Sequence, residues 1–232
     1  GHRLDTTLVE LNSDAKISGL FTSNKFKSAP VQICLDQFEA KMKGKKMLAI
    51  NAGNANAATG KKGVSDAKKI IQEISNLTNI STTQILPFST GVVGQLLDVK
   101  QLSSAFNKCF KNLSKNSWDD FAKAIMTTDT KSKIIKLPFK AGSKKYHIVG
   151  IAKGVGMIEP NMATTLSYVF TDLKIPELTL RKLHKRICDK TFNAISIDGD
   201  QSPSDSSILV ATGSSKINFR NYSKKIEKDI FS

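Results

Sequence analysis

The sequence of 232 residues is poor in the side chains that build disulfides and metal sites. Its three cysteines, Cys34, Cys109 and Cys188, are widely spaced and form no CxxC pair. We therefore predict neither a disulfide framework nor a thiolate zinc site, and interpret the cysteines as small buried residues. The three histidines show no HxH or HxxxH spacing. This argues against a metal site and against a histidine-dependent triad.

Long hydrophobic runs are also missing. No stretch approaches the roughly 18 consecutive apolar residues of a membrane span, and the N-terminal region lacks the pattern of a signal peptide. We expect a protein without a membrane partner, located in the cytoplasm, or in the mitochondrial matrix if the source is a eukaryote. The chain begins at Gly1 without Met and ends in "KKIEKDIFS", so we expect a fragment of a longer protein.

Acidic residues are scarce relative to basic ones, and the net charge is +15. One segment, residues 131–145, holds six lysines and no acidic residue. Such a charge is compatible with a nucleic-acid-binding module. However, the lysines extend along the whole chain, are little interleaved with aromatic residues and match no known module. We interpret them as a solvated surface and expect no nucleic-acid partner.

Hydrophobic periodicity predicts one α/β body over residues 1–232, without internal repeats or long linkers. Helices are expected after a cap at Ser65, over 102–113, over 118–125, and from Pro176 through Ile187. The predicted strands are 47–53, 146–154, 164–173, 192–200 and 206–213.

Two glycine-rich segments resemble nucleotide-binding loops only at first sight. Gly53 and Gly60 enclose six residues where a Walker A loop has four, and Lys61 is followed by another lysine. In "GIAKGVG" the glycine spacing does not fit the dinucleotide fingerprint. We infer that these glycines serve backbone shape.

The segment "KGVGMIEPNMATTLSY", residues 153–168, fits an ordinary loop before a strand, because threonine is common in strands, and it also fits a self-processing site. Cleavage before a threonine frees an α-amino group, with a pKa of roughly 7.7 to 8.0, that can act as a base for the hydroxyl of the same residue. Such a site needs a small preceding residue, here Ala163, a turn, and oxyanion donors. "FSTGVVG" (88–94), interpreted as a polar turn, offers those donors. Composition alone does not choose between Thr164 and Thr165 as the nucleophile.

Several segments, in this order, resemble the ornithine acetyltransferase family of arginine biosynthesis. They are "FTSNKFKSAPV" (21–31), "NAGNANAATG" (51–60), "STGVVG" (89–94), "AIMTTDT" (124–130), "GIAKGVGMIEPNMATTL" (150–166), "TDL" (171–173) and "FNAISIDGD" (192–200). The resemblance implies a layered α/β sandwich of the self-processing type that DmpA-like aminopeptidases share. It also implies cleavage between Ala163 and Thr164. The products are an α chain, represented here by 1–163, and a β chain that begins with 164–232.

The resemblance assigns roles residue by residue. Thr164 is the nucleophile, Thr90 and Gly91 form the oxyanion hole, and Thr127 and Lys153 bind substrate. The implied reaction moves an acetyl group from N-acetylornithine to glutamate through an acetylated Thr164, with no bound cofactor. Whether acetyl-CoA is also a donor stays open, because no residue separates the monofunctional from the bifunctional members. The implied assembly is a heterotetramer of two α and two β chains.

The sequence departs from the family pattern in one loop. The family's "DGDTSTND" reads "DGDQSPSD" at 198–205, with changes at Gln201, Pro203 and Ser204. The altered loop leaves open an inactive, uncut paralogue. Two further alternatives to acetyl transfer rest on other features: a self-processing aminopeptidase or amidohydrolase on the related folds, and a basic nucleic-acid-binding module on charge alone.

Overall fold

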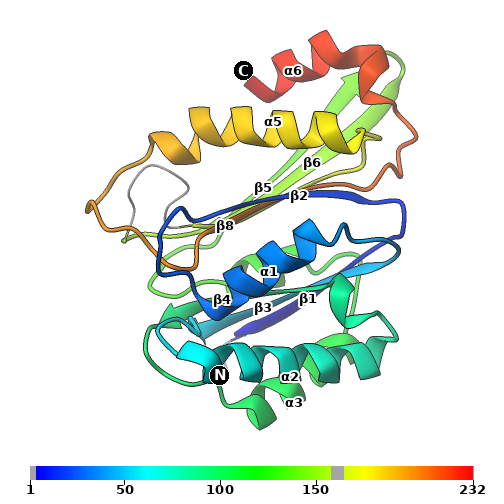
Figure 1. Cartoon of the computed structure of the whole chain (residues 1–232). Helices are drawn as coiled ribbons and strands as arrows, with labels where there is room; N and C mark the ends of the chain where they lie inside the picture. The colour runs from blue at the N-terminus through cyan, green and yellow to red at the C-terminus, as the bar shows by residue number, and fades with distance from the viewer. Residues whose placement is uncertain (1–3, 158–164, 232) are drawn as a thin grey trace.

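The computed structural model describes residues 4–157 and 165–231, and it contains two β-sheets between layers of helices (Figure 1). The smaller sheet has the strand order β1-β3-β4, with bounds Thr6–Leu11, Lys46–Asn54 and Ile85–Val92. The larger sheet has the order β2-β8-β7-β6-β5, with bounds Lys16–Phe21, Ser206–Ala211, Leu166–Thr171, Lys144–Lys153 and Lys133–Ala141. The chain therefore crosses between the two sheets three times, after β1, after β2 and after β4.

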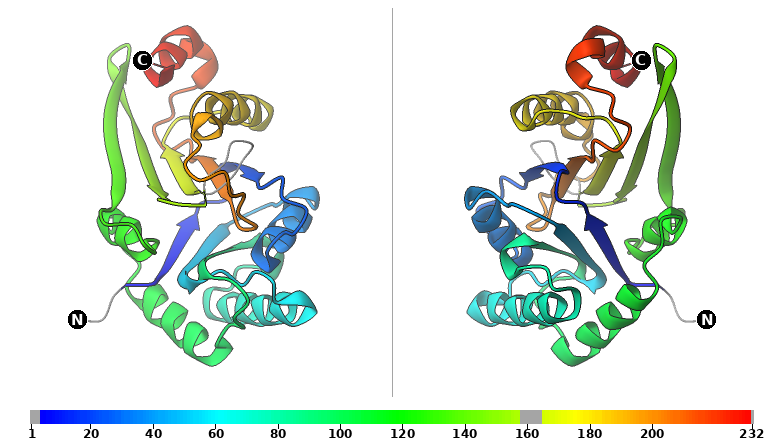
Figure 2. Two further views of the ribbon diagram at one scale, coloured as in Figure 1. Left: turned by 90° about the vertical axis from the view of Figure 1, so that its left-hand side faces the viewer. Right: turned by 90° about the vertical axis from the view of Figure 1, so that its right-hand side faces the viewer.

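Most of the helices cover the outer faces of the two sheets (Figure 2). α2 (Gly60–Thr78) and α3 (Val99–Lys111) pack on the smaller sheet, and α5 (Glu177–Lys190) and α6 (Ser223–Phe231) lie over the larger one. α1 (Ala29–Glu39) and α4 (Trp118–Ala124) contribute to the core between the sheets. Short 3-10 turns occupy Thr82–Gln84, Phe192–Ala194 and Phe219–Tyr222. The predicted layered α/β sandwich is confirmed.

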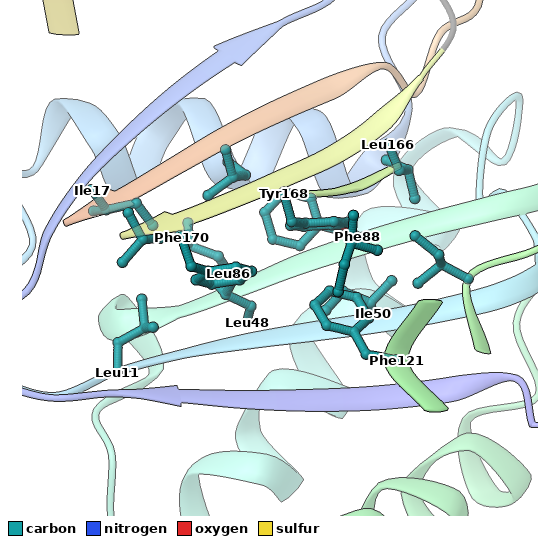
Figure 3. Packing of buried hydrophobic residues seen from close by; sticks show 14 of the residues in the cluster. Leu11, Ile17, Leu48, Ile50, Leu86, Phe88, Phe121, Leu166, Tyr168 and Phe170 are labelled. Atoms are coloured by element: carbon teal, nitrogen blue, oxygen red, sulfur yellow. The ribbon is translucent and has the colours of Figure 1, made fainter. Parts of the chain in front are cut away.

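The pattern of β3 explains why its sheet is buried on both faces. Met47 and Ala49 pack against α2 and α3, whereas Leu48 and Ile50 face the larger sheet. A strand alternates its side chains between faces, so an uninterrupted apolar run suits a strand with two covered faces. Between the sheets, Phe88 lies against Tyr168 (Figure 3). Their ring centroids are 5.4 Å apart, in an edge-on arrangement.

Most predicted elements are present, but three local predictions were wrong. α2 begins at Gly60 rather than after Ser65, because the Gly63 N–H already donates to the Thr59 carbonyl (3.2 Å) and the Asn56 side chain donates to the Gly63 carbonyl (3.0 Å). No strand forms over 192–200: Gly199 has a φ of +74°, and the Asp198 carboxylate accepts backbone N–H bonds that hold a loop. The segment 88–94, predicted as a polar turn, is mostly strand, since β4 continues through Thr90 and Gly91 to Val92.

Other expectations concern exposure. Cys34 and Cys188 are buried as predicted, whereas Cys109 is half-buried. The six lysines of 131–145 are all exposed, on or beside the β5–β6 hairpin. In the part of the chain that the structure describes, no helix is long and apolar enough to cross a membrane.

Candidate active site

The oxyanion residues predicted from the sequence lie where two parallel strands end. β3 and β4 pair in parallel, so their carboxyl ends meet at one edge of the smaller sheet, and Gly53 stands opposite Gly91. Gly91 has a φ of +131°, and a Cβ there would lie 2.2 Å from the Gly53 carbonyl carbon. Only glycine fits this position. The buried Thr90 precedes it. Among the described residues, no side chain is hydrogen-bonded to the Thr90 hydroxyl.

The "NAGNANAATG" segment supports this strand end through its side-chain amides. The Asn51 side chain accepts a hydrogen bond from Ser89 (2.6 Å) and donates one to the Asn54 carbonyl (2.9 Å). The fully buried Asn56 donates to the Gly63 carbonyl at the start of α2 (3.0 Å). These contacts agree with the inference that this segment serves backbone shape.

The larger sheet supplies the opposite wall. β6 ends at Lys153, and β7 begins beside it at Leu166 in antiparallel register. The Thr165 hydroxyl donates to the Lys153 carbonyl at 2.5 Å, while the Thr165 carbonyl accepts from the Ser206 N–H at the start of β8 (3.0 Å). Thr165 therefore ties two strand ends together.

A pocket of about 630 Å³ lies between these two walls. Among the residues that line it are four of the predicted site residues: Thr90, Gly91, Thr127 and Lys153. The structure thus brings together residues from separate segments of the sequence. Ala163 and Thr164 lie outside the described residues, and the adjoining Met157 and Leu166 line the pocket. A larger groove of about 1200 Å³ runs along β1 between α3 and α4, and none of the four predicted site residues that the structure describes lines it.

Lys153 is the cationic centre of the pocket. Its ammonium lies 3.5 Å from the Thr127 hydroxyl. Burial lowers the pKa of Lys153 below its ordinary value of 10.5; the carboxylates of Asp129 and Asp205 oppose this shift, and the charge of Lys133 adds to it. A half-buried ammonium beside a hydroxyl is suited to binding a carboxylate.

The sequence reasoning missed Asp129, although the "MTTDT" segment contains it. Its side chain is fully buried and accepts hydrogen bonds from the backbone N–H groups of Gly154 (3.0 Å) and Thr127 (3.3 Å). Lys133 completes its shell with an ion pair. Burial raises the pKa of Asp129, but these contacts outweigh burial and leave the pKa below the ordinary value of 3.8. Asp205, 5% exposed, also lines the pocket.

The described residues contain no cluster of side chains typical of a metal site. Over residues 4–157 and 165–231, no three His, Cys, Asp or Glu side chains are grouped so that they could hold a metal ion. His147 contacts Asp172 on the exposed surface, and His184 is buried between Ser18 and Ser207.

A model of one protein family, the ArgJ family, matches residues 1–231. The chain belongs to the ArgJ family. Two curated relatives, both named arginine biosynthesis bifunctional protein ArgJ, are each 41% identical to it. The protein of Colwellia psychrerythraea matches 92% of this chain and 53% of its own length. For Caldanaerobacter subterraneus subsp. tengcongensis the shares are 90% and 51%. The chain therefore spans about half the length of these ArgJ relatives.

A solved ArgJ structure supports the fold. The crystal structure of the ArgJ protein of Bacillus halodurans is 23% identical, covers 67% of this chain and 98% of that chain, and has a TM-score of 0.54. At this identity the likeness concerns the fold alone. It agrees with the layered α/β architecture that the resemblance to the ornithine acetyltransferases implied.

Proposed function

We propose that the full-length protein is an acetyltransferase of arginine biosynthesis that moves an acetyl group from N-acetylornithine to glutamate. The observation that carries this proposal is the convergence of Thr90, Gly91, Thr127 and Lys153 on one pocket beside the start of β7. These positions were assigned from separate segments of the sequence. Membership of the ArgJ family, whose curated relatives are named for arginine biosynthesis, supports the same reaction.

The proposed activation is self-cleavage. The Thr164 hydroxyl attacks the Ala163 carbonyl, the peptide bond becomes an ester, and water hydrolyses that ester. Ala163 then ends in a carboxylate, and Thr164 carries a free α-amino group. Thr165 is poorly placed for this role, because its hydroxyl already donates to the Lys153 carbonyl.

Acetyl transfer follows in two halves. The Thr164 α-amino group takes the hydroxyl proton, the oxygen attacks the acetyl carbonyl, and ornithine leaves with that proton on its amine. The Thr90 hydroxyl and the Gly91 N–H stabilise the oxyanion, a role worth about 3 to 4 kcal/mol for one donor. Lys153 and Thr127 bind the substrate carboxylate. The glutamate amine then attacks the Thr164 ester and leaves as N-acetylglutamate.

The two products of cleavage are expected to stay associated. Strands β7 and β8 belong to the proposed β chain, and both of their outer neighbours, β6 and β2, belong to the α chain. Separation would break two antiparallel pairings and expose the core between the sheets. The cut chains should therefore coelute under native conditions and separate only in denaturant. The heterotetramer of two α and two β chains is tested by native mass spectrometry, in which a lone αβ pair would contradict it.

The test of the reaction uses full-length protein with N-acetylornithine and glutamate. We expect ornithine and N-acetylglutamate in equal amounts, without an added cofactor. Acetate without N-acetylglutamate would favour a hydrolase of the same architecture, and no product from a correctly cut protein would contradict the proposal. A parallel reaction with acetyl-CoA and glutamate tests whether acetyl-CoA is a second donor.

A further inference from the structure

Asp129 holds together the two segments that carry the proposed substrate-binding residues. One carboxylate oxygen accepts from the Gly154 N–H, directly after Lys153, and the other accepts from the N–H of Thr127. Gly154 has a φ of +144°, so the turn at the end of β6 has a conformation that favours glycine. A buried carboxylate that accepts two backbone N–H bonds is a strong local constraint.

We propose that Asp129 is the positioning residue that sets Lys153 and Thr127 as one recognition unit for the carboxylate of the acetyl donor. The proposal rests on the proposed function. Asp129 itself is 7% exposed and does not line the pocket, whereas Thr127 and Lys153 do. It acts by fixing their backbones, so that the Lys153 ammonium and the Thr127 hydroxyl lie 3.5 Å apart.

The charge of Asp129 has a second effect on the same unit. The charged groups that act on Lys153 are Asp129 and Asp205, which favour its ammonium form, and Lys133, which disfavours it. Replacing Asp129 by Asn removes one favourable charge and leaves the unfavourable one. The pKa of Lys153 should then fall further. As the pH rises, D129N should therefore lose the ammonium charge, and with it substrate binding, at a lower pH than the wild type.

The chain offers a matched control in α2. Asp66 is also fully buried and also pairs with exposed lysines, Lys62 and Lys69, but all three residues lie in α2, and no described residue of α2 lines the pocket. D66N therefore imitates the loss of a buried, lysine-paired carboxylate without touching the proposed site. A purely structural role for Asp129 predicts that D129N and D66N behave alike.

The experiment compares full-length wild type, D129N, D129E and D66N. With N-acetylornithine as donor, we expect D129N to raise KM about tenfold and to change kcat less than about threefold. The rise in KM with pH should begin at lower pH in D129N. D129E should restore much of the wild-type KM, because it keeps the charge, and D66N should keep the wild-type KM and pH profile.

A second measurement does not depend on activity. Reductive methylation with ¹³C-formaldehyde followed by NMR titration reports the pKa of Lys153 directly, with K153R to assign the signal. The proposal predicts a lower Lys153 pKa in D129N than in wild type and D66N. A wild-type titration and KM in D129N would overturn it, as would equal changes in D66N. If the wild type transfers no acetyl group but the titration shifts, the proposed function fails while the coupling of Asp129 to Lys153 stands.

Discussion

The backbones of Gly91 and Gly53 touch across the paired ends of β4 and β3. A Cβ on Gly91 would lie 2.2 Å from the Gly53 carbonyl carbon and 2.6 Å from the Asn54 nitrogen. The strand end that presents Thr90 to the pocket therefore depends on the absence of a side chain at the next residue. This contact links the glycine-rich "NAGNANAATG" and "STGVVG" segments to each other.

This contact predicts that G91A is far more damaging than an alanine at another glycine of the same segment. Gly94 also has a positive φ, +85°, but has nothing within 4 Å of an added Cβ. G94A should cost about 1 to 2 kcal/mol of backbone strain, whereas G91A adds a clash with backbone and should cost more than about 3 kcal/mol or prevent folding. Urea unfolding of the full-length variants measures the difference. Similar midpoints for the two variants would contradict the close approach.

His184 predicts a pH dependence of stability. It is 3% exposed, its ring nitrogens lie 2.9 Å from the hydroxyls of Ser18 and Ser207, and burial lowers its pKa from 6.5 to about 4. The unfolded chain therefore takes up the proton first as the pH falls. The contribution of neutral His184 is complete above pH 6.5 and declines as the pH falls toward 4.

The expected loss is about 2 kcal/mol in the free energy of unfolding between about pH 7.5 and pH 5. Urea unfolding of the wild type and H184Q over this range measures it as the difference between their slopes. A wild-type slope in H184Q would show that His184 is not buried in its neutral form.

Tyr168 predicts a stabilising substitution. The residue is fully buried, and among the described residues its hydroxyl has no hydrogen-bond partner. Its ring packs against Phe88 and Phe121, with centroid distances of 5.4 and 5.2 Å. Y168F keeps these ring contacts and removes the unpaired hydroxyl, so it should raise the free energy of unfolding by about 1 kcal/mol.

The control for this prediction is Y146F. Tyr146 is equally buried, but its hydroxyl is not unpaired, so its loss should bring no gain. Thermal unfolding of the full-length variants compares the two. A clear loss of stability in Y168F would mean that the hydroxyl has a partner, such as a buried water.

The sequence predicted well those elements whose apolar residues face one covering layer. Ile70, Ile71 and Ile74 share one face of α2, and all three pack on the smaller sheet. Ile195 and Ile197 also alternate as in a strand, yet they are 47% and 58% exposed because no neighbouring strand pairs with them. Hydrophobic periodicity predicts a strand or helix correctly only where another layer of the tertiary structure packs on the apolar face.

The site was predictable in part. The resemblance identified Thr90, Gly91, Thr127 and Lys153, which line one pocket, but their roles stay predictions. Asp129 was not predicted, because its proposed role depends on the hydrogen bonds that it accepts from the backbone N–H groups of Thr127 and Gly154. These N–H groups come close to each other only when β6 and the segment after α4 fold together, and no residue spacing in the sequence predicts that contact.

The central claim is that Thr164, and not Thr165, becomes the N-terminal nucleophile. Intact-mass measurement of the full-length protein under denaturing conditions tests it most directly, with T164A and T165V measured beside the wild type. We predict two chains in the wild type and T165V, one ending at Ala163 and one beginning at residue 164, with a summed mass one water above that of the precursor. T164A should give one uncut chain. A single uncut chain in the wild type, or a cut T164A, would contradict the account.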